Sequence, residues 1–200
     1  MTSTDHAPTA PVGSSALDDP TPTGTVRLVA SALVGAAVSV ALGVYGRAHS
    51  PTGERILNVG AVDTLTMKAW LATGLIVLVA TQLGSAFWMF GRLSRLGPAP
   101  TWIGPLHRWS GTAAFLLTLP VAYHCLWSLG FQDRTTRVLV HSLAGCAFYG
   151  ALATKLLVLR SDRMPRWAVP VAGAGLVTTL AVIWLTSALW FFTGLELPPG

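Results

Sequence analysis

Four histidines lie within or beside long apolar stretches of the sequence: His49, His107, His124 and His141. A neutral histidine holds a nitrogen lone pair that can ligate a metal or accept a proton. Ionisable side chains are costly inside a membrane and are therefore functional candidates there. No aspartate or glutamate falls within the five long apolar stretches. This composition disfavours a proton-relay transporter, whose pathway normally needs buried carboxylates.

His124 and His141 are expected at the same depth of the membrane. His124 lies about five residues before the end of the apolar stretch 106–129, and His141 lies about four residues inside the next stretch, 137–159. Because the connection is only some seven residues long, both side chains face the same leaflet. Two neutral imidazoles at one depth suit the iron of a b-type haem, since each supplies a nitrogen without adding charge. The sequence therefore predicts haem b with His124 and His141 as metal ligands.

Alternatives to this pairing stay open. Histidines on opposite sides of one iron hold their helices further apart than the about 8 to 10 Å of packed helices, so the hairpin would have to splay. Otherwise one of the two pairs with His49, or with a helix across the bundle. A histidine one turn inside a span can also simply hydrogen-bond a carbonyl or a lipid headgroup.

Cations near the same leaflet would bind the haem propionates. Arg134 and Arg137 lie in and directly after the short connection, and Arg47 follows the first apolar stretch. His49 lies at or beyond the membrane boundary on this side. Its expected secondary role is propionate binding.

His107 is expected at the opposite interface. It lies 17 residues before His124, which is about 25 Å along a helix. Arg108 follows it, and amphipathic side chains collect at membrane interfaces. Since no second histidine reaches this leaflet, His107 is predicted to be an interfacial residue and not an iron ligand.

The elements that would position these residues follow from the composition. Of 200 residues, 52% are hydrophobic and 10% are charged, with a mean hydropathy of +0.58. Soluble domains carry about 25% charged residues. Long neutral gaps separate the charges, and a helix of roughly 20 residues crosses a bilayer. The sequence therefore predicts an all-α, polytopic membrane bundle with five transmembrane helices in a domain over 26–195. The expected spans are about 26–46, 66–91, 106–129, 137–159 and 167–193.

The same composition excludes a water-soluble enzyme, a disulfide scaffold and a nucleic-acid binder. The net charge is +5, but the basic residues bracket the spans and do not form a stripe on a soluble surface. We therefore expect the lipid bilayer, and no nucleic acid, as the partner of this surface.

Residues 1–25 are rich in Thr, Ser, Pro and Ala and are expected to form a disordered cytoplasmic tail. They show no pattern of a cleaved signal peptide. With the amino terminus inside, eight basic residues flank the spans in the cytoplasm and five flank them outside, as the positive-inside rule favours. We expect a multi-pass protein of the cell membrane with a cytoplasmic amino terminus and an external carboxyl terminus.

Small residues four positions apart predict close helix packing, which we expect to occur within the chain. They are Gly35, Ser39 and Gly43 in the first span, and Ala80 and Gly84 in the second. Cys125 and Cys146 lie inside spans at different depths. Both are predicted to be packing residues and not a disulfide pair.

The segment Leu106-His107-Arg108-Trp109-Ser110-Gly111 resembles the His-Arg-x-x-Gly segment of small b-haem membrane cytochromes of the cytochrome b561 and ferric-reductase-like type. This resemblance implies a multi-helix bundle that binds haem. The di-haem pattern places four histidines as two pairs, one per leaflet. Here an inner haem would lack a second histidine.

A longer part of the chain, from roughly His49 to Phe192, resembles a family of small actinobacterial membrane proteins of unknown function. Four stretches carry this resemblance: residues 49–53, 68–73, 116–130 and 141–155.

Three functions compete. The favoured one is a b-type haem electron-transfer protein that takes electrons from a quinol or a redox partner protein. The second is a non-enzymatic membrane scaffold or complex subunit, and the third is a metal or small-solute transporter using the outer histidines with Cys125 and Cys146. No residue is assigned a catalytic role.

Overall fold

The computed structural model describes residues 22–54, 63–162 and 164–194, and these are almost entirely helical. The long helices are α1 (Pro22–Ala48), α2 (Thr64–Met89), α3 (Ile103–Tyr123), α4 (Thr136–Arg160) and α5 (Ala168–Trp184). A 3-10 turn, η1 (Ser94–Leu96), lies between α2 and α3. A π-helix, η2 (His124–Leu129), continues α3, while α5 continues through a second π-helix, η3 (Leu185–Leu189), into α6 (Trp190–Thr193).

The five predicted spans are confirmed. The helical segments long and apolar enough to cross a membrane are Gly24–Ala48, Thr64–Met89, Ile103–Leu129, Thr136–Arg160 and Ala168–Thr193. The described residues contain no strand, so the all-α fold class is confirmed as well. Helix α1 begins at Pro22, so residues 22–25 of the expected tail are helical. The rest of that tail, residues 1–21, lies outside the described residues.

Side-chain caps explain two of the helix starts. The Asp63 carboxylate accepts hydrogen bonds from the backbone N–H groups of Leu65 and Thr66, so α2 begins two residues before the predicted span. The Thr135 hydroxyl accepts from Val138 N–H at the start of α4. Both residue types satisfy backbone donors that a helix start leaves unpaired.

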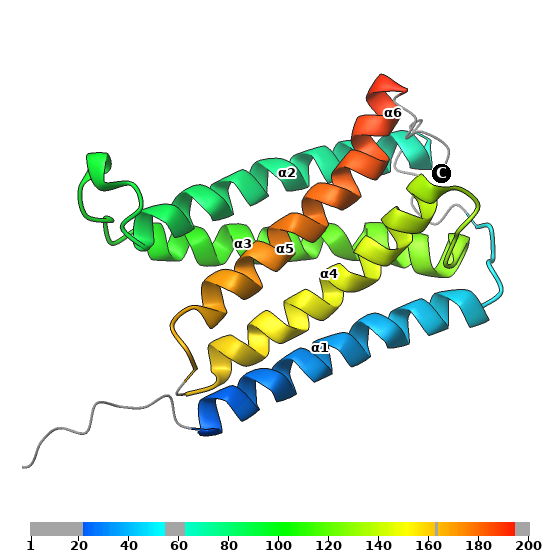
Figure 1. The fold of residues 1–200 in the computed structure, drawn as a ribbon. Helices are drawn as coiled ribbons and strands as arrows, with labels where there is room; N and C mark the ends of the chain where they lie inside the picture. Colours follow the sequence, from blue (N-terminus) through cyan, green and yellow to red (C-terminus); the bar gives the residue numbers. More distant parts are fainter. Residues whose placement is uncertain (1–21, 55–62, 163, 195–200) are drawn as a thin grey trace, which may run out of the picture.

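The helices pack as two groups joined through α5. Helix α4 lies between α1 and α5, while α2 and α3 run side by side (Figure 1). Helix α2 also contacts α5 and η3, which connects the groups. In the middle of the bundle a cluster of buried apolar side chains draws on both groups; its members are Leu75, Val79, Ala114, Phe148, Leu176 and Leu180.

Helices α3 and α4 are consecutive, but they are not among the closely packed pairs of the described helices. The Tyr149 hydroxyl on α4 reaches the Thr118 hydroxyl on α3 at 3.0 Å, so a long side chain bridges the space between the two backbones. The two helices of this hairpin are therefore separated, and the Tyr149–Thr118 hydrogen bond connects them.

Small residues allow α1 and α4 to approach closely. A Cβ atom added at Gly35 would lie 2.5 Å from the carbonyl oxygen of Gly150. Gly43, two turns further along α1, faces the sulfur of Cys146. The predicted packing within the chain is thus confirmed for the first span. On α2, Ala80 and Gly84 are exposed, and a Cβ at Gly84 would meet open space.

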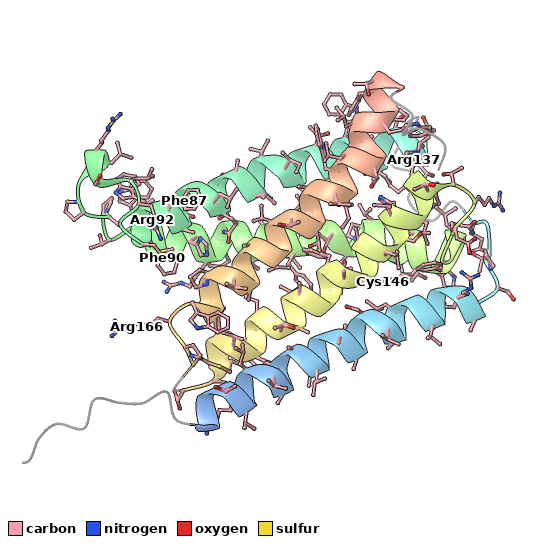
Figure 2. All side chains as sticks on the ribbon, in the orientation of Figure 1. Phe87, Phe90, Arg92, Arg137, Cys146 and Arg166 are labelled. Atoms are coloured by element: carbon pink, nitrogen blue, oxygen red, sulfur yellow. The ribbon has the colours of Figure 1, made fainter. Side chains whose placement is uncertain are left out.

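All five spans alternate in direction, which gives the bundle two distinct ends. The ends of α1, α3 and α6 and the starts of α2 and α4 lie together at one of them, here named the His141 end. Figure 2 shows Arg137 at this end and Cys146 further along α4, while Arg92 and Arg166 lie at the opposite end, named the His107 end.

Candidate functional site

A cavity of about 320 Å³ lies between the two helix groups near the His141 end. Its walls come from all five spans, including η2, η3 and α6, and from the loop after η2, and most of the lining side chains are apolar. The polar exceptions include Lys68, Arg137, His141 and Tyr149. Both cysteines also line it and are free thiols, as predicted. Among the described residues that line the cavity, none is acidic.

Both π-helices border this cavity. Pro120 lacks the N–H that would continue the α-helical ladder, and the π-helix η2 follows four residues later. In η3, the hydroxyls of Thr186 and Ser187 donate to the carbonyls of Val182 and Ile183, respectively, and so compete with the backbone N–H groups. π-Helical turns are rare and often occur at functional sites. Their coincidence here marks the His141 end as the candidate site.

His141 on α4 is half-buried and lines the cavity. Its Nδ1 lies 3.0 Å from the Thr186 hydroxyl oxygen. That hydroxyl has one proton, which it donates to the Val182 carbonyl at 2.7 Å. With the hydroxyl donating to this carbonyl, it accepts a hydrogen bond from Nδ1–H of His141, and this arrangement leaves Nε2 with the lone pair. Metal-binding histidines show this arrangement, in which one nitrogen donates to a neighbouring group and the other ligates.

His124 begins η2 and is buried, with 5% of its surface exposed. Its Nδ1 lies 3.4 Å from the ammonium nitrogen of Lys68. Because an ammonium group has only donors, Nδ1 of His124 must accept, and Nε2 of the neutral ring then carries the proton. His124 is not among the lining residues, whereas Lys68 is. The structure thus brings both predicted ligands to the same end of the bundle, with only His141 at the cavity wall.

The predicted arginines differ in their surroundings. The Arg137 guanidinium lies 3.8 Å from the ring centroid of Trp190 and donates to the Thr186 carbonyl at 2.7 Å, at the cavity wall. Arg134 is exposed in the connecting loop and does not line the cavity. Arg47 forms an exposed ion pair with Asp133 at 2.8 Å. Of the three predicted cations, only Arg137 lies where a ligand in the cavity could meet it.

His49 packs the loop that follows α1. Its ring stacks on Tyr45 with centroids 5.3 Å apart and contacts the Trp127 ring at 4.4 Å. Its Nε2 is buried and has no hydrogen-bond partner in the described part of the chain. The same loop supplies the Gly53 N–H to the Ser128 carbonyl at 3.1 Å, which caps the end of η2. His49 thus lies beside η2 but is not part of the cavity wall.

His107 lies near the start of α3, at the other end of the bundle. Its Nδ1 lies 2.8 Å from the Ser85 hydroxyl, whose own proton goes to the Thr81 carbonyl. The Gln82 side-chain amide donates to the Ser110 hydroxyl at 2.6 Å. A Cβ atom added at Gly111 would lie 3.2 Å from the side-chain oxygen of Gln82, so the two helices are close here. The His-Arg-x-x-Gly segment therefore fastens α3 to α2.

Sequence patterns do not identify three partners of the histidines. Lys68 is one of the five basic residues counted on the outer side of the spans, while Thr186 and Ser85 carry no signal of a role. Lys68 carried a usable signal, because it is the only charged residue of its predicted span. In the described ranges, no group of three or more His, Cys, Asp or Glu side chains is arranged to hold a metal ion.

The chain belongs to a family of unknown function, DUF6529, which matches residues 28–199. No curated protein and no solved structure matches the chain. The resemblance to a family of unknown function is therefore confirmed. The resemblance to b-haem cytochromes rests on residues 106–111 and stays a prediction.

Proposed function

We propose that this DUF6529 protein binds a b-type haem in the cavity at the His141 end and transfers electrons in the membrane. The observation that supports this most directly is His141, whose Nδ1 is engaged by Thr186 and whose Nε2 keeps its lone pair beside an apolar cavity. The haem would supply a one-electron redox centre. A quinol or a redox partner protein would supply the electrons.

The residues that line the cavity, which include His141 but not His124, support binding of such a group. A porphyrin needs apolar walls, which residues of all five spans provide, and its two carboxylates need cations. Lys68 and Arg137 line the cavity, and no acidic side chain among the described lining residues neutralises them. These two residues, instead of Arg134 or Arg47, are the cations proposed to bind the carboxylates.

The axial ligands proposed are His141 from α4 and His124 from η2. The space between α3 and α4 agrees with this proposal, because histidines across an iron hold their helices apart. Thr186 would act through His141 as a positioning residue that fixes its tautomer and ring orientation.

The test is the optical spectrum of the full chain, purified from cells supplied with haem. We expect a Soret band and sharp bands on reduction, typical of a low-spin b-type haem. His141→Ala should abolish the low-spin spectrum, while His49→Ala should retain it. A wild-type protein that inserts and folds but carries no haem would overturn the proposal and leave the scaffold function in its place.

A further inference from the structure

Among the described residues that line the cavity, no carboxylate accompanies the cation Lys68. It lies on the second turn of α2, and its ammonium nitrogen contacts Nδ1 of His124 at 3.4 Å. The nearest acidic residue along α2 is Asp63, whose carboxylate accepts from Leu65 N–H, Thr66 N–H and the Thr66 hydroxyl. A charge in an apolar setting is stabilised by an opposite charge. The cavity therefore favours a ligand that carries an anionic group.

The contact with Lys68 also determines which ring nitrogen of His124 carries the proton. While the ammonium donates to Nδ1, the single proton of the neutral ring lies on Nε2. An imidazole can ligate only through a nitrogen without a proton. His141 shows the opposite arrangement, because its Nδ1–H donates to the Thr186 hydroxyl oxygen. In the present structure, Nε2 of His141 can ligate and Nε2 of His124 cannot.

We propose that Lys68 is the anion-binding residue of the cavity and that its displacement makes His124 a ligand. A carboxylate on an apolar, planar guest binds the Lys68 ammonium and draws it away from His124. The ring then loses its proton at Nε2 and gains one at Nδ1, so no net proton is taken up or released. The porphyrin carboxylate as the natural anion rests on the proposed haem function, whereas the Lys68–His124 contact does not.

The other charged and titratable groups around the cavity leave this role to Lys68. Arg137 is held by the Trp190 ring and the Thr186 carbonyl, and it has no contact with a histidine ring nitrogen in the described structure. The Tyr149 hydroxyl donates to Thr118. Arg137 is thus fixed in position to receive a second carboxylate, while Lys68 couples anion binding to the state of His124.

The experiment is nitrogen NMR of the full chain labelled with ¹⁵N-histidine, in nanodiscs of phosphatidylcholine. We expect His124 to carry its proton on Nε2 in the wild type and to lose this preference in Lys68→Met. The matched control is Lys155→Met, which removes a lysine in the last two turns of α4 that does not line the cavity. A wild-type His124 protonated on Nδ1, or an unchanged His124 in Lys68→Met, would overturn the proposal.

The guest is tested with iron-free protoporphyrin IX and its dimethyl ester. Only the free acid should move the His124 proton to Nδ1, since the ester has no carboxylate to bind Lys68. Equal effects of the two compounds, or no effect of the free acid, would overturn the proposal. If phosphatidylglycerol in the nanodisc moves the proton without any porphyrin, the natural anion is a lipid headgroup and the porphyrin assignment is overturned.

Haem binding itself is then measured by titration with hemin. Lys68→Met should bind hemin about tenfold more weakly than the wild type, and Lys155→Met should bind it equally well. Equal affinity of Lys68→Met and the wild type would contradict the anion-binding role. A wild type that binds no hemin would contradict the haem function, while the NMR result with Lys68→Met would still decide the contact with His124.

Discussion

Nδ1 of His141 and the Thr186 hydroxyl oxygen lie 3.0 Å apart, and that hydroxyl donates a hydrogen bond to the Val182 carbonyl. With the hydroxyl donating to that carbonyl, it accepts from Nδ1–H of His141, and this tautomer is set without any charged group. Such outer partners of a ligating histidine raise its basicity and hold its ring orientation. The π-helix η3 places Thr186 at this position, opposite the start of α4.

Replacing Thr186 with valine should weaken haem binding. The substitution removes the acceptor for Nδ1–H and leaves the ring free to change its tautomer. Loss of an outer partner typically reduces metal affinity by about 10- to 100-fold. The measurement is a hemin titration followed in the Soret region. Thr179→Val is the matched control, because Thr179 also donates to a carbonyl four residues earlier but touches no histidine in the described structure.

Replacing either of the two proposed haem ligands should remove the low-spin haem spectrum. His141→Ala removes the ligand that is already in its binding tautomer, so the low-spin spectrum should be lost. His124→Ala should leave either no haem or a high-spin, five-coordinate haem on His141. His49→Ala should keep the wild-type spectrum, because His49 packs against Tyr45 and Trp127 away from the cavity wall. If both ligand variants stay low-spin while His49→Ala loses haem, the proposed pairing is wrong.

Replacing Gly150 with alanine should destabilise the bundle. The new Cβ would press against Ser39 and the backbone of Gly35, where α1 crosses α4. Overpacking of this kind costs about 1 to 3 kcal/mol in the free energy of unfolding. Gly84→Ala makes the same chemical change on α2 in open space, where alanine favours a helix. Thermal unfolding in detergent should show a lower midpoint for Gly150→Ala alone.

The helices could be predicted from the sequence because each long stretch without charged residues indicates a transmembrane helix. The placement of His124 and His141 at the same end of the bundle could be predicted as well, since the connection between their spans is short. The depth of a side chain depends mainly on its distance from the helix end. That distance is visible in the sequence.

The direction of each side chain could not be predicted in the same way. A π-helix inserts an extra residue into a turn, so the residues after it rotate relative to an ideal α-helix. Both His124 and Thr186 lie within such segments. The partners Lys68 and Thr186 come from other helices, and their contacts depend on how α2 and α5 pack. Hydropathy carries no information on that packing.

The helical domain is expected to have one orientation in the membrane, with its amino terminus in the cytoplasm. Five spans place the two ends of the helical domain on opposite sides, and the basic flanks favour the amino terminus in the cytoplasm. The His141 end would then face outward. A reporter that works only outside the cytoplasm should be active when fused after Gly200. Activity of a cytoplasmic reporter at the same position would reverse the orientation.

Replacing His107 with alanine should lower stability and leave the haem spectrum unchanged. His107 bonds to Ser85 at the end of the bundle opposite His141, and the described residues place no second histidine there. The substitution would leave the buried Ser85 hydroxyl without its donor, and a lost hydrogen bond of this kind costs about 1 to 3 kcal/mol. Thermal unfolding and optical spectra of the same preparation separate the two effects. A folded His107→Ala protein without haem would show that the iron lies nearer to the His107 end and that the ligands proposed here are wrong.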